Sequence, residues 1–249
     1  MRVLAFDTAT RATTVALSGA GRDRDVVYTA RNDPSPDRRP GHAAYLLPLT
    51  ARVLDRAGIG WDGVERLAVG VGPGTFTGLR IGIATARALA RARDLPLVGV
   101  STLQSLALAG ARARASLAGP DSGAATAELD AVFAVLDARR GEVFAASWRI
   151  DEAEDFDSAL LLAHAFAPEA LAELMAPLGS TALAIGDGAI AFRKVLERSG
   201  ALIPDDDSQL HRVTATNHCR LAVSLRASVP QEVRPDYLRA PDAEIAHRR

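Results

Sequence analysis

The first hundred residues alternate between short apolar runs and longer segments with helical spacing. The short runs are rich in β-branched side chains and predict strands over residues 3–6, 12–18, 25–30, 67–71 and 97–100. Helical spacing predicts helices over 42–57, from Thr75 or Thr77 onward, and over 102–115. Pro48 lies inside the first of these helices and is expected to kink it or to mark a late start.

The same order of elements returns in the second half. A strand that ends at Asp7 leads through a polar turn into a second strand, and the strand over 132–136 ends at Asp137 and leads into a strand over 142–148. In both halves a strand, a glycine turn and a helix follow, at 67–89 and at 181–198. The pattern predicts an internal duplication. We expect a lobe over 1–104, a smaller lobe over 105–214, a flexible connector over 117–128, and a C-terminal helix and tail over 215–249 that pack back on the first lobe.

The stretch over 67–89 is the most distinctive part of the chain. Its glycine turn at 72–74 precedes a helix, which suits a phosphate, but it lacks the Lys-Ser/Thr pair of a P-loop and the spacing of a dinucleotide fingerprint. Within the helix, Gly78, Gly82, Ala86 and Ala90 recur every four residues. Glycine inside a helix costs about 0.5–1 kcal/mol relative to alanine, so something must pack closely against this stripe. Two explanations stay open: the protein's own sheet or a neighbouring helix, and an interface with a second chain.

Composition and charge exclude several classes of protein. The chain has 249 residues, of which 48% are hydrophobic and 24% charged, and its net charge is −1. These values are typical of an ordinary globular protein with no global attraction to nucleic acid. The one cysteine, Cys219, cannot form an internal disulfide. The first residues are charged too early for a signal peptide, and no apolar run approaches the ~20 residues of a membrane span. We therefore expect a cytoplasmic protein without membrane association.

Two β-rich halves, each with an aspartate at the tip of a hairpin, favour the actin-like ATPase architecture, a two-lobed α/β fold of the ribonuclease H-like type. In that architecture the two hairpins face one another across a cleft and hold the phosphates of ATP. The motifs also closely resemble the bacterial TsaB (YeaZ) family, which is related to the TsaD transferase family. The resemblance covers nearly the whole chain, and its motifs lie at Phe6–Thr10, Gly72–Gly82, Asp137–Phe144, Gly186–Ala189 and Pro235–Arg239.

The resemblance implies a non-catalytic subunit. Members of this family act with a TsaD-type transferase and a TsaE-type ATPase, and help to install threonylcarbamoyl on N6 of the adenosine beside the anticodon of ANN-decoding tRNAs. They pair through the helices of the first half, as a homodimer or with the transferase, and meet tRNA indirectly through the complex. This favours a partner interface for the glycine stripe, with the expected interface residues Leu46, Leu49, Val53, Gly78, Arg80, Gly82 and Ala86.

The residues of the hairpins indicate a vestigial nucleotide site. A nucleotide clamp of this architecture uses Asp-x-Gly-Thr-like loops, but here Ala9 and Arg139 stand at the glycine positions. We expect no catalytic residue, no metal ligand and no cofactor required by this chain, with ATP or ADP acting at the level of the complex. The vestigial set is Asp7, Thr8, Thr10, Gly72, Gly74, Asp137, Gly186 and Gly188.

Several single residues have competing interpretations. The catalytic relative resembles a metal enzyme with a His-x-x-x-His pair, whereas here Leu46 follows His42 at that spacing, so His42 is interpreted as an ordinary helix-start residue. Asp7 and Asp137 suit either Mg²⁺ or plain turns. Cys219 lies on a predicted helix where its histidine neighbour does not face it. The Arg139–Arg140 pair suits tRNA phosphates, but a solvated turn is favoured.

Two other functions stay open from the sequence alone. The first alternative is an ATP-dependent sugar- or acetate-kinase-like enzyme that uses the cleft between the lobes. The second is a protease, because the wider family has been labelled as glycoproteases. No spacing of Ser, His and Asp or of zinc ligands supports it.

Overall fold

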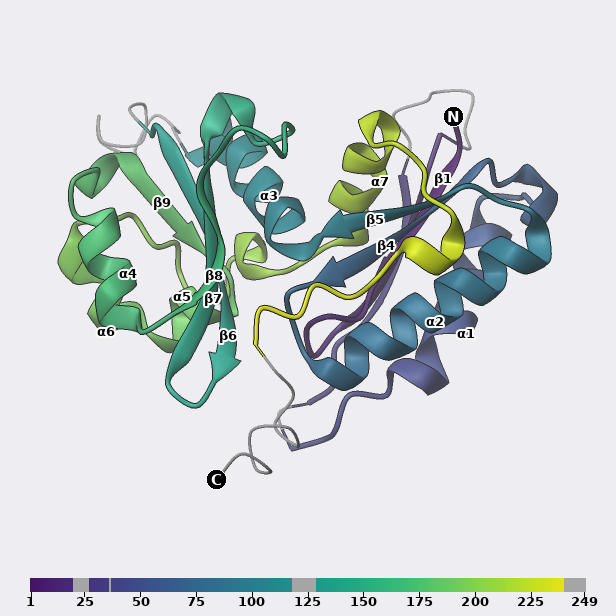
Figure 1. Ribbon diagram of the computed structural model, residues 1–249, viewed down its shortest axis with the longest axis horizontal. Coiled ribbons are helices and arrows are strands. Elements are labelled where there is room, and N and C mark those ends of the chain that lie inside the picture. Colours follow the sequence, from purple (N-terminus) through teal and green to yellow (C-terminus); the bar gives the residue numbers. More distant parts are fainter. Residues whose placement is uncertain (20–26, 36, 118–128, 240–249) are drawn as a thin grey trace. The chain divides into compact units, whose positions relative to one another are not determined.

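The computed structural model describes residues 1–19, 27–35, 37–117 and 129–239 (Figure 1). It divides into two compact units, with Met1–Ser105 and Val213–Arg249 in unit 1 and Leu106–Arg212 in unit 2. Unit 2 is therefore inserted in sequence between the two segments of unit 1. Three predicted segments lie outside the described residues, namely 118–128 of the connector, 25–26 of the third strand and 240–249 of the C-terminal tail.

Unit 1 contains a five-stranded mixed sheet. Its strand order is β3-β2-β1-β4-β5, in which β1, β2 and β3 form an antiparallel meander and β4 and β5 run parallel to β1. Crossover helices connect the parallel strands, as such strands require. The strands are β1 (Val3–Asp7), β2 (Thr13–Ser18), β3 (Val27–Asn32), β4 (Arg66–Gly72) and β5 (Leu97–Ser101), and the helices are α1 (His42–Arg56), α2 (Phe76–Arg93) and α7 (Ala215–Ser224). Helix α3 (Thr102–Leu117) begins in unit 1 and belongs to unit 2 from Leu106 onward.

Helices cover both faces of this sheet. Because successive strand residues point to opposite faces, Leu4 and Phe6 point toward α1 and α2, while Val3 and Asp7 lie on the side of α7. The buried core between the sheet and the helices α1 and α2 includes Val15, Leu17, Leu46, Val53, Leu67, Val69, Ile83 and Ala86. The segment after α7 returns along α2, where the Arg87 guanidinium donates hydrogen bonds to the carbonyls of Gln231 and Val233.

Unit 2 repeats this plan in a smaller form. Its sheet has the order β8-β7-β6-β9, with antiparallel β6–β7 and β7–β8 pairs and a parallel β6–β9 pair. One face packs on short helices around Phe133, Val135, Leu171 and Met175. The elements are β6 (Ala131–Arg139), β7 (Glu142–Arg149), β8 (Ala159–Phe166), α4 (Pro168–Met175), β9 (Ala182–Ile185), α5 (Asp187–Ala191) and α6 (Arg193–Leu196).

Short 3₁₀ turns complete both units. They lie at Trp61–Gly63, Ile150–Glu152, Gly179–Thr181, Glu197–Ser199, Gln209–His211 and Pro230–Glu232. Among the residues described, none of the helices combines the length and the apolar character that a membrane span requires.

The topology confirms the predicted α/β fold of the actin-like, ribonuclease H-like class with an internal duplication. Differences are local. Helix α1 continues through Pro48, and α2 begins at Phe76 with Thr75 at its N-cap, although the Thr75 side chain makes no capping hydrogen bond. The helix expected up to residue 198 is interrupted at Phe192 and forms two short helices, α5 and α6. Strand β8 was not predicted.

Candidate functional site

Asp7 ends β1, and its side chain is completely buried. Its Oδ1 accepts a hydrogen bond from the backbone N–H of Ala9 at 2.7 Å, and its Oδ2 accepts one from the Thr102 hydroxyl at 2.8 Å. Nε2 of His218, on α7, lies 3.0 Å from the same Oδ2. Gly70 on the adjacent β4 leaves the necessary space, since a Cβ at that position would clash with the carboxylate. The first hairpin, α3 and α7 thus all hold this one carboxylate.

These contacts decide the protonation state of Asp7. Burial alone would raise the pKa of its carboxyl, because a charged group loses solvation in the core. The hydrogen bond and charge of His218, together with the hydrogen bonds from Ala9 and Thr102, outweigh burial and hold the pKa of Asp7 below its ordinary value. Asp7 is therefore a buried, ionised and fully engaged carboxylate at neutral pH.

The other ring nitrogen of His218 extends the network. Nδ1 lies 2.8 Å from the Ser105 hydroxyl and 3.1 Å from the Thr214 carbonyl, and the Asn217 amide donates to the Ser105 carbonyl at 2.9 Å. Ser105, His218 and Asp7 form a Ser–His–Asp sequence of contacts, but all three are completely buried. A serine nucleophile must reach its substrate. The network therefore joins β1, α3 and α7 structurally and gives the protease alternative no accessible nucleophile.

The glycine stripe of α2 packs against the hairpin of its own unit. A Cβ at Gly78 would clash with the Thr8 carbonyl and lie 2.6 Å from the Thr75 hydroxyl, and a Cβ at Gly82 would clash with the Thr8 hydroxyl. The Thr8 hydroxyl in turn donates to the Gly78 carbonyl at 2.7 Å, and the Thr75 N–H donates to the Ala9 carbonyl at 2.7 Å. The small residues of the stripe are needed because the β1–β2 turn approaches the helix backbone so closely.

The outer faces of α1 and α2, which point away from the sheet, are apolar and exposed. On α1, Tyr45 is 46% exposed and Leu47 is 51% exposed. Small exposed residues accompany them: Ala44, Pro48 and Ala51 on α1, and Thr77, Ala84 and Ala88 on α2, with Ile81 half-buried. Exposed charged residues, among them Arg52 and Asp55 on α1 and Arg91 and Arg93 on α2, lie toward the C-terminal ends of the two helices. The small side chains allow another helix to approach closely.

Arg80 lies at the edge of this face in an aromatic cluster. Its guanidinium carbon is 3.8 Å from the centre of the Phe76 ring, and its Nε donates to the Tyr237 hydroxyl at 3.2 Å. The Phe76 and Tyr237 rings are 5.3 Å apart, and the Asp236 N–H donates to the Val71 carbonyl at 2.8 Å. The segment around Asp236 and Tyr237 therefore packs on the start of α2.

The second hairpin holds its aspartate in a more open setting. Asp137 Oδ1 accepts the Arg139 N–H at 2.8 Å, and its Oδ2 forms an ion pair with the Arg139 guanidinium at 2.9 Å. The two side chains are 21% and 59% exposed. The Asp137 N–H donates to Asp187 Oδ1 at 3.0 Å, and a Cβ at Gly188 would lie 2.7 Å from the Leu136 carbonyl carbon. This carboxylate is reachable from solvent, but its nearest cation is its own neighbour.

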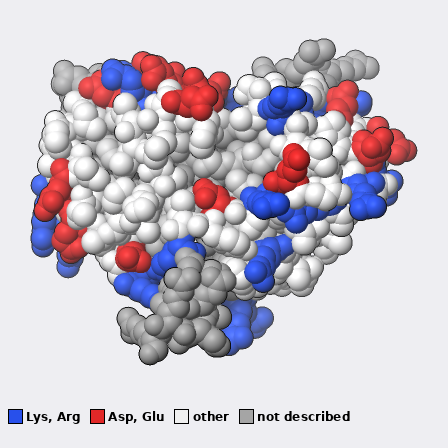
Figure 2. Space-filling model, in the orientation of Figure 1, with Lys and Arg blue, Asp and Glu red and all other residues white. Residues whose placement is uncertain are grey.

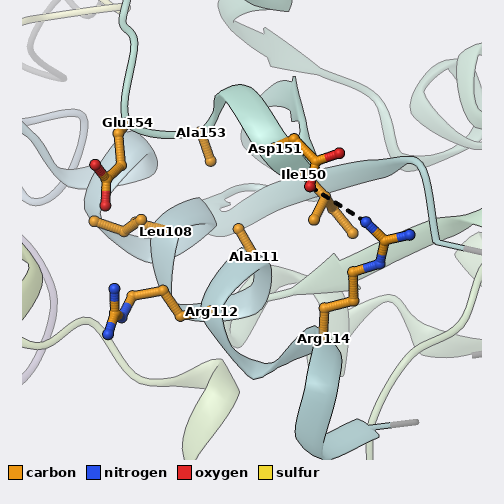
Figure 3. A pocket seen from close by; sticks show the side chains of 8 residues that line it. All are labelled: Leu108, Ala111, Arg112, Arg114, Ile150, Asp151, Ala153 and Glu154. Carbon is orange, nitrogen blue, oxygen red and sulfur yellow. Dashed lines mark hydrogen bonds and ion pairs between the residues drawn. The ribbon is translucent and has the colours of Figure 1, made fainter. Parts of the chain in front are cut away.

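Unit 2 also contains an open cavity of ≈ 170 Å³ between α3 and the turn that begins at Ile150 (Figure 3). Its apolar floor includes Leu108 and Ala111. Charged groups of both signs line it, and Arg114 pairs with Asp151 at 3.3 Å. A cavity that places carboxylates beside its arginines does not favour a phosphate. This cavity was not predicted from the sequence.

Comparisons with known proteins place this geometry in a family. The sequence profile described as "tRNA N6-adenosine threonylcarbamoyltransferase", the TsaD profile, matches residues 38–247. The Escherichia coli protein described as "tRNA threonylcarbamoyladenosine biosynthesis protein TsaB" is 34% identical over 212 residues, which are 83% of this chain and 80% of that protein. The chain belongs to the TsaB (YeaZ) family. A solved structure of YeaZ from Pseudomonas aeruginosa matches with a TM-score of 0.70 at 25% identity, and the match covers 95% of this chain and 99% of that one.

The pairwise match to one transferase sequence spans a shorter segment than the transferase family model does. The tRNA N6-adenosine threonylcarbamoyltransferase of Novosphingobium aromaticivorans is 43% identical over 79 residues, which are 32% of this chain and only 23% of that protein. The TsaB-family relationship thus covers most of the chain, whereas this transferase match covers about a third of it.

The structure corrects the expected interface residues. Leu46, Leu49 and Val53 are buried in the core of unit 1, and Gly78, Gly82 and Ala86 face its own hairpin and sheet. The interface interpretation is wrong for these six, because a helical stripe shows which residues are buried but not what buries them. Arg80 is exposed, as an interface residue must be. The first explanation of the glycine stripe, packing on the protein's own sheet, is confirmed.

The expected vestigial nucleotide residues fall into two groups, one in each unit. Unit 1 brings Asp7, Thr8 and Gly74 together around the β1–β2 turn, with Thr10 half-buried, whereas Gly72 faces Leu79 and the Asp236 carbonyl. Unit 2 brings Asp137, Gly186 and Gly188 together. Their role in nucleotide binding stays a prediction. In the described part of the chain, no three His, Cys, Asp or Glu side chains converge as a metal site.

Two predicted single residues have clear environments. His42 begins α1 and is buried, with Nδ1 2.8 Å from the Thr13 hydroxyl, and burial lowers the pKa of its imidazole. Burial raises the pKa of the Cys219 thiol to about 12, so it is not a nucleophile at neutral pH.

The roles of His218, Ser105 and Thr102 in the network around Asp7 were not predicted from the sequence. The sequence signal for these roles is weak. Polar and apolar residues alternate over Asn217, His218 and Cys219 on one short helix, and this pattern does not show which side chains face the core.

Proposed function

We propose that this chain is a non-catalytic subunit in the biosynthesis of threonylcarbamoyladenosine in tRNA, acting with a TsaD-type transferase and a TsaE-type ATPase. The names of its TsaB relatives support the pathway. The observation that carries the non-catalytic role is the engagement of Asp7. Both of its oxygens are used by the chain itself, so the first hairpin offers no free carboxylate to a metal or to a reacting group.

The partner surface that the structure supports is the exposed outer face of α1 and α2. Ala44, Leu47, Pro48 and Ala51 on α1, with Ala84 and Ala88 on α2, replace the buried residues expected from the sequence. An apolar face of small side chains suits the packing of two further helices, from the transferase or from a second copy of this chain. Arg80 lies at its rim, where arginine is a common anchor of interfaces.

The proposal also includes the cellular compartment of the protein, its cofactor requirement and its contact with tRNA. We propose that the chain works in the cytoplasm, requires no cofactor of its own, and meets tRNA indirectly through the assembled complex, in which ATP or ADP is bound.

Reconstitution tests this function. The transferase and ATPase subunits of the same organism are supplied with threonylcarbamoyl adenylate, ATP and tRNA, and modified adenosine is quantified with and without this chain. We expect product only when the chain is present, and none from the chain alone. Equal product without the chain would refute the proposal.

A surface variant tests the docking face separately. Leu47→Asp is expected to leave the fold intact, because Leu47 is half exposed, and to weaken association with the transferase subunit about tenfold or more in a titration. Leu174→Asp is the matched control, since Leu174 is 49% exposed on α4 in unit 2. Equal affinities of both variants and the wild type would show that partners dock elsewhere.

A further inference from the structure

We propose that unit 2 carries a docking surface for a basic, amphipathic helical segment of a partner protein. The surface, termed here the β8 surface, consists of the acidic turn over 151–158 and the outward side chains of β8. The proposal rests on unit 2 alone and is independent of the outer face of α1 and α2.

Large apolar side chains are exposed together on the β8 surface. Phe156 is 51% exposed, Leu160 is 51% exposed and Leu162 is 73% exposed. Burial alternates along β8, so Leu160 and Leu162 point to one side while Leu161 packs toward the core. Three such side chains within seven positions mark a site of interaction rather than isolated surface residues.

The turn that carries Phe156 is already ordered. Ile150 and Ala153 are buried, and they anchor its first half beside α3 (Figure 3). In its second half, the Ser158 hydroxyl lies 2.8 Å from the carbonyls of both Glu152 and Asp155. The Asp157 N–H donates to the Asp155 carboxylate at 3.0 Å. A partner that binds this turn therefore does not have to order it, which favours affinity.

Charge specifies the chemistry of the partner. The turn contains five carboxylates, those of Asp151, Glu152, Glu154, Asp155 and Asp157. Figure 2 shows acidic side chains gathered at the end of this unit where β7 leads toward β8, with basic side chains among them, above a largely uncharged face. Of the five carboxylates, that of Asp151 is paired with Arg114 at 3.3 Å. Such a surface repels nucleic acid and a second copy of itself, and it attracts lysine and arginine.

The geometry of β8 favours a helix as the occupant. β8 is an edge strand, but its pairing with β7 is irregular at Ala145/Ser147 and again at Ser147/Trp148. Irregular pairing of this kind twists an edge strand and disfavours the addition of another strand. A partner would therefore contact the side chains of β8 rather than its backbone N–H and C=O groups. An amphipathic helix with leucines on one side and lysines beside them fits both the apolar and the acidic parts.

Fluorescence anisotropy with the full chain tests the proposal. The probe is a short labelled helical peptide with a leucine face flanked by lysines, and its two matched versions replace every lysine by glutamate or every leucine by serine. We expect binding of the leucine–lysine peptide and at least tenfold weaker binding of the other two. Added salt should weaken the binding of the leucine–lysine peptide, because part of its affinity is electrostatic.

Variants locate the binding. Leu160→Ser with Leu162→Ser should weaken binding at least tenfold, and Glu152→Gln with Asp157→Asn about threefold, without removing a side-chain hydrogen bond of the turn. The controls on α4 are Leu174→Ser, and Glu169→Gln with Glu173→Gln, and they should leave binding unchanged. Equal binding by the wild type and the leucine variant, or equal binding of the glutamate peptide, would overturn the proposal.

Discussion

The hairpins β1–β2 and β6–β7 begin in the same way and end in different environments. In both, an aspartate near the end of the first strand accepts the N–H two residues later, from Ala9 at 2.7 Å and from Arg139 at 2.8 Å. In both, a neighbouring parallel strand leads into a helix through glycines that press on the hairpin. Asp7 is nevertheless completely buried, whereas the Asp137 side chain is 21% exposed and pairs with a largely exposed arginine.

The difference shows how a shared local motif acquires separate roles. Unit 1 has α7 across the face of its sheet, and α7 supplies His218 to the Asp7 carboxylate. In unit 2, an arginine of the hairpin itself meets Asp137. The first carboxylate has become part of the core, and the second has stayed at the surface. Strand and turn patterns do not distinguish these outcomes, because the deciding residue comes from another element.

The largest expected effect comes from removing the partner of each aspartate. His218→Ala should destabilise unit 1 by about 3–5 kcal/mol, since it leaves a buried charge without its partner. Arg139→Ala should cost unit 2 less than about 1 kcal/mol, because that pair is exposed to solvent. The only tryptophans are Trp61 in unit 1 and Trp148 in unit 2, so denaturant unfolding in Trp61→Phe and Trp148→Phe backgrounds follows each unit separately. Equal losses in both units would remove the contrast between the hairpins.

A second prediction concerns a feature that the two units share, the close packing of a helix glycine against the hairpin backbone. Gly78→Ala should destabilise unit 1, and Gly188→Ala unit 2, each by about 1–3 kcal/mol, because in both cases a Cβ meets the backbone of the hairpin. Gly82→Leu should also destabilise the fold, rather than leave it intact as an interface glycine would allow, because Thr8 occupies that space. The same tryptophan backgrounds provide the measurement, and Ala84→Leu on the exposed side of α2 is the control. A soluble, equally stable Gly82→Leu protein would contradict this packing.

The pH dependence of unit 1 gives a third test. The pKa of Asp7 is held below its ordinary value of 3.8, so the unfolded chain binds this proton more readily than the folded one. The contribution of Asp7 is therefore complete above the ordinary value and is lost as the pH falls through the lowered pKa. Asp7→Asn should be less stable than the wild type at neutral pH, and the difference should shrink in acid. A difference that stays constant down to the acid transition would show that ionisation of Asp7 does not stabilise unit 1.

The smallest expected effect is on the rate at which a thiol reagent labels Cys219. Cys219 is buried, its thiol pKa is about 12, and it lies in the same helix as His218. A thiol reagent at mildly alkaline pH should label the native protein only as fast as unit 1 opens. His218→Ala should accelerate labelling, and Arg139→Ala should leave it unchanged. Rapid labelling of the native wild-type protein would mean that α7 does not seal this face of the sheet.

Local patterns predicted the elements well. The strands β1, β2, β4, β6 and β7 and the helices α1 and α2 follow from apolar runs and helical spacing, because burial of one face imposes those periods. Strand β8 was missed because its exposed leucines and its irregular pairing obscure the alternation.

Contacts between distant segments could not be predicted in the same way. Leu46 and Gly82 were recognised as special, but only the fold shows that their neighbours are the protein's own sheet and hairpin. The pair of Asp7 and His218 is separated by 211 positions in the sequence, and no spacing rule connects them.

The insertion of unit 2 between the two segments of unit 1 has a consequence for synthesis on the ribosome. The whole of unit 2 has been made by Arg212, but the sheet of unit 1 still lacks the helix that covers β1 and β2. At about 5–20 residues per second, Asp7 waits on the order of 10–40 s for His218 to be translated. The part of the protein that is begun first is therefore completed last, and until then it presents an apolar sheet face and an unpaired carboxylate to the cell's chaperones.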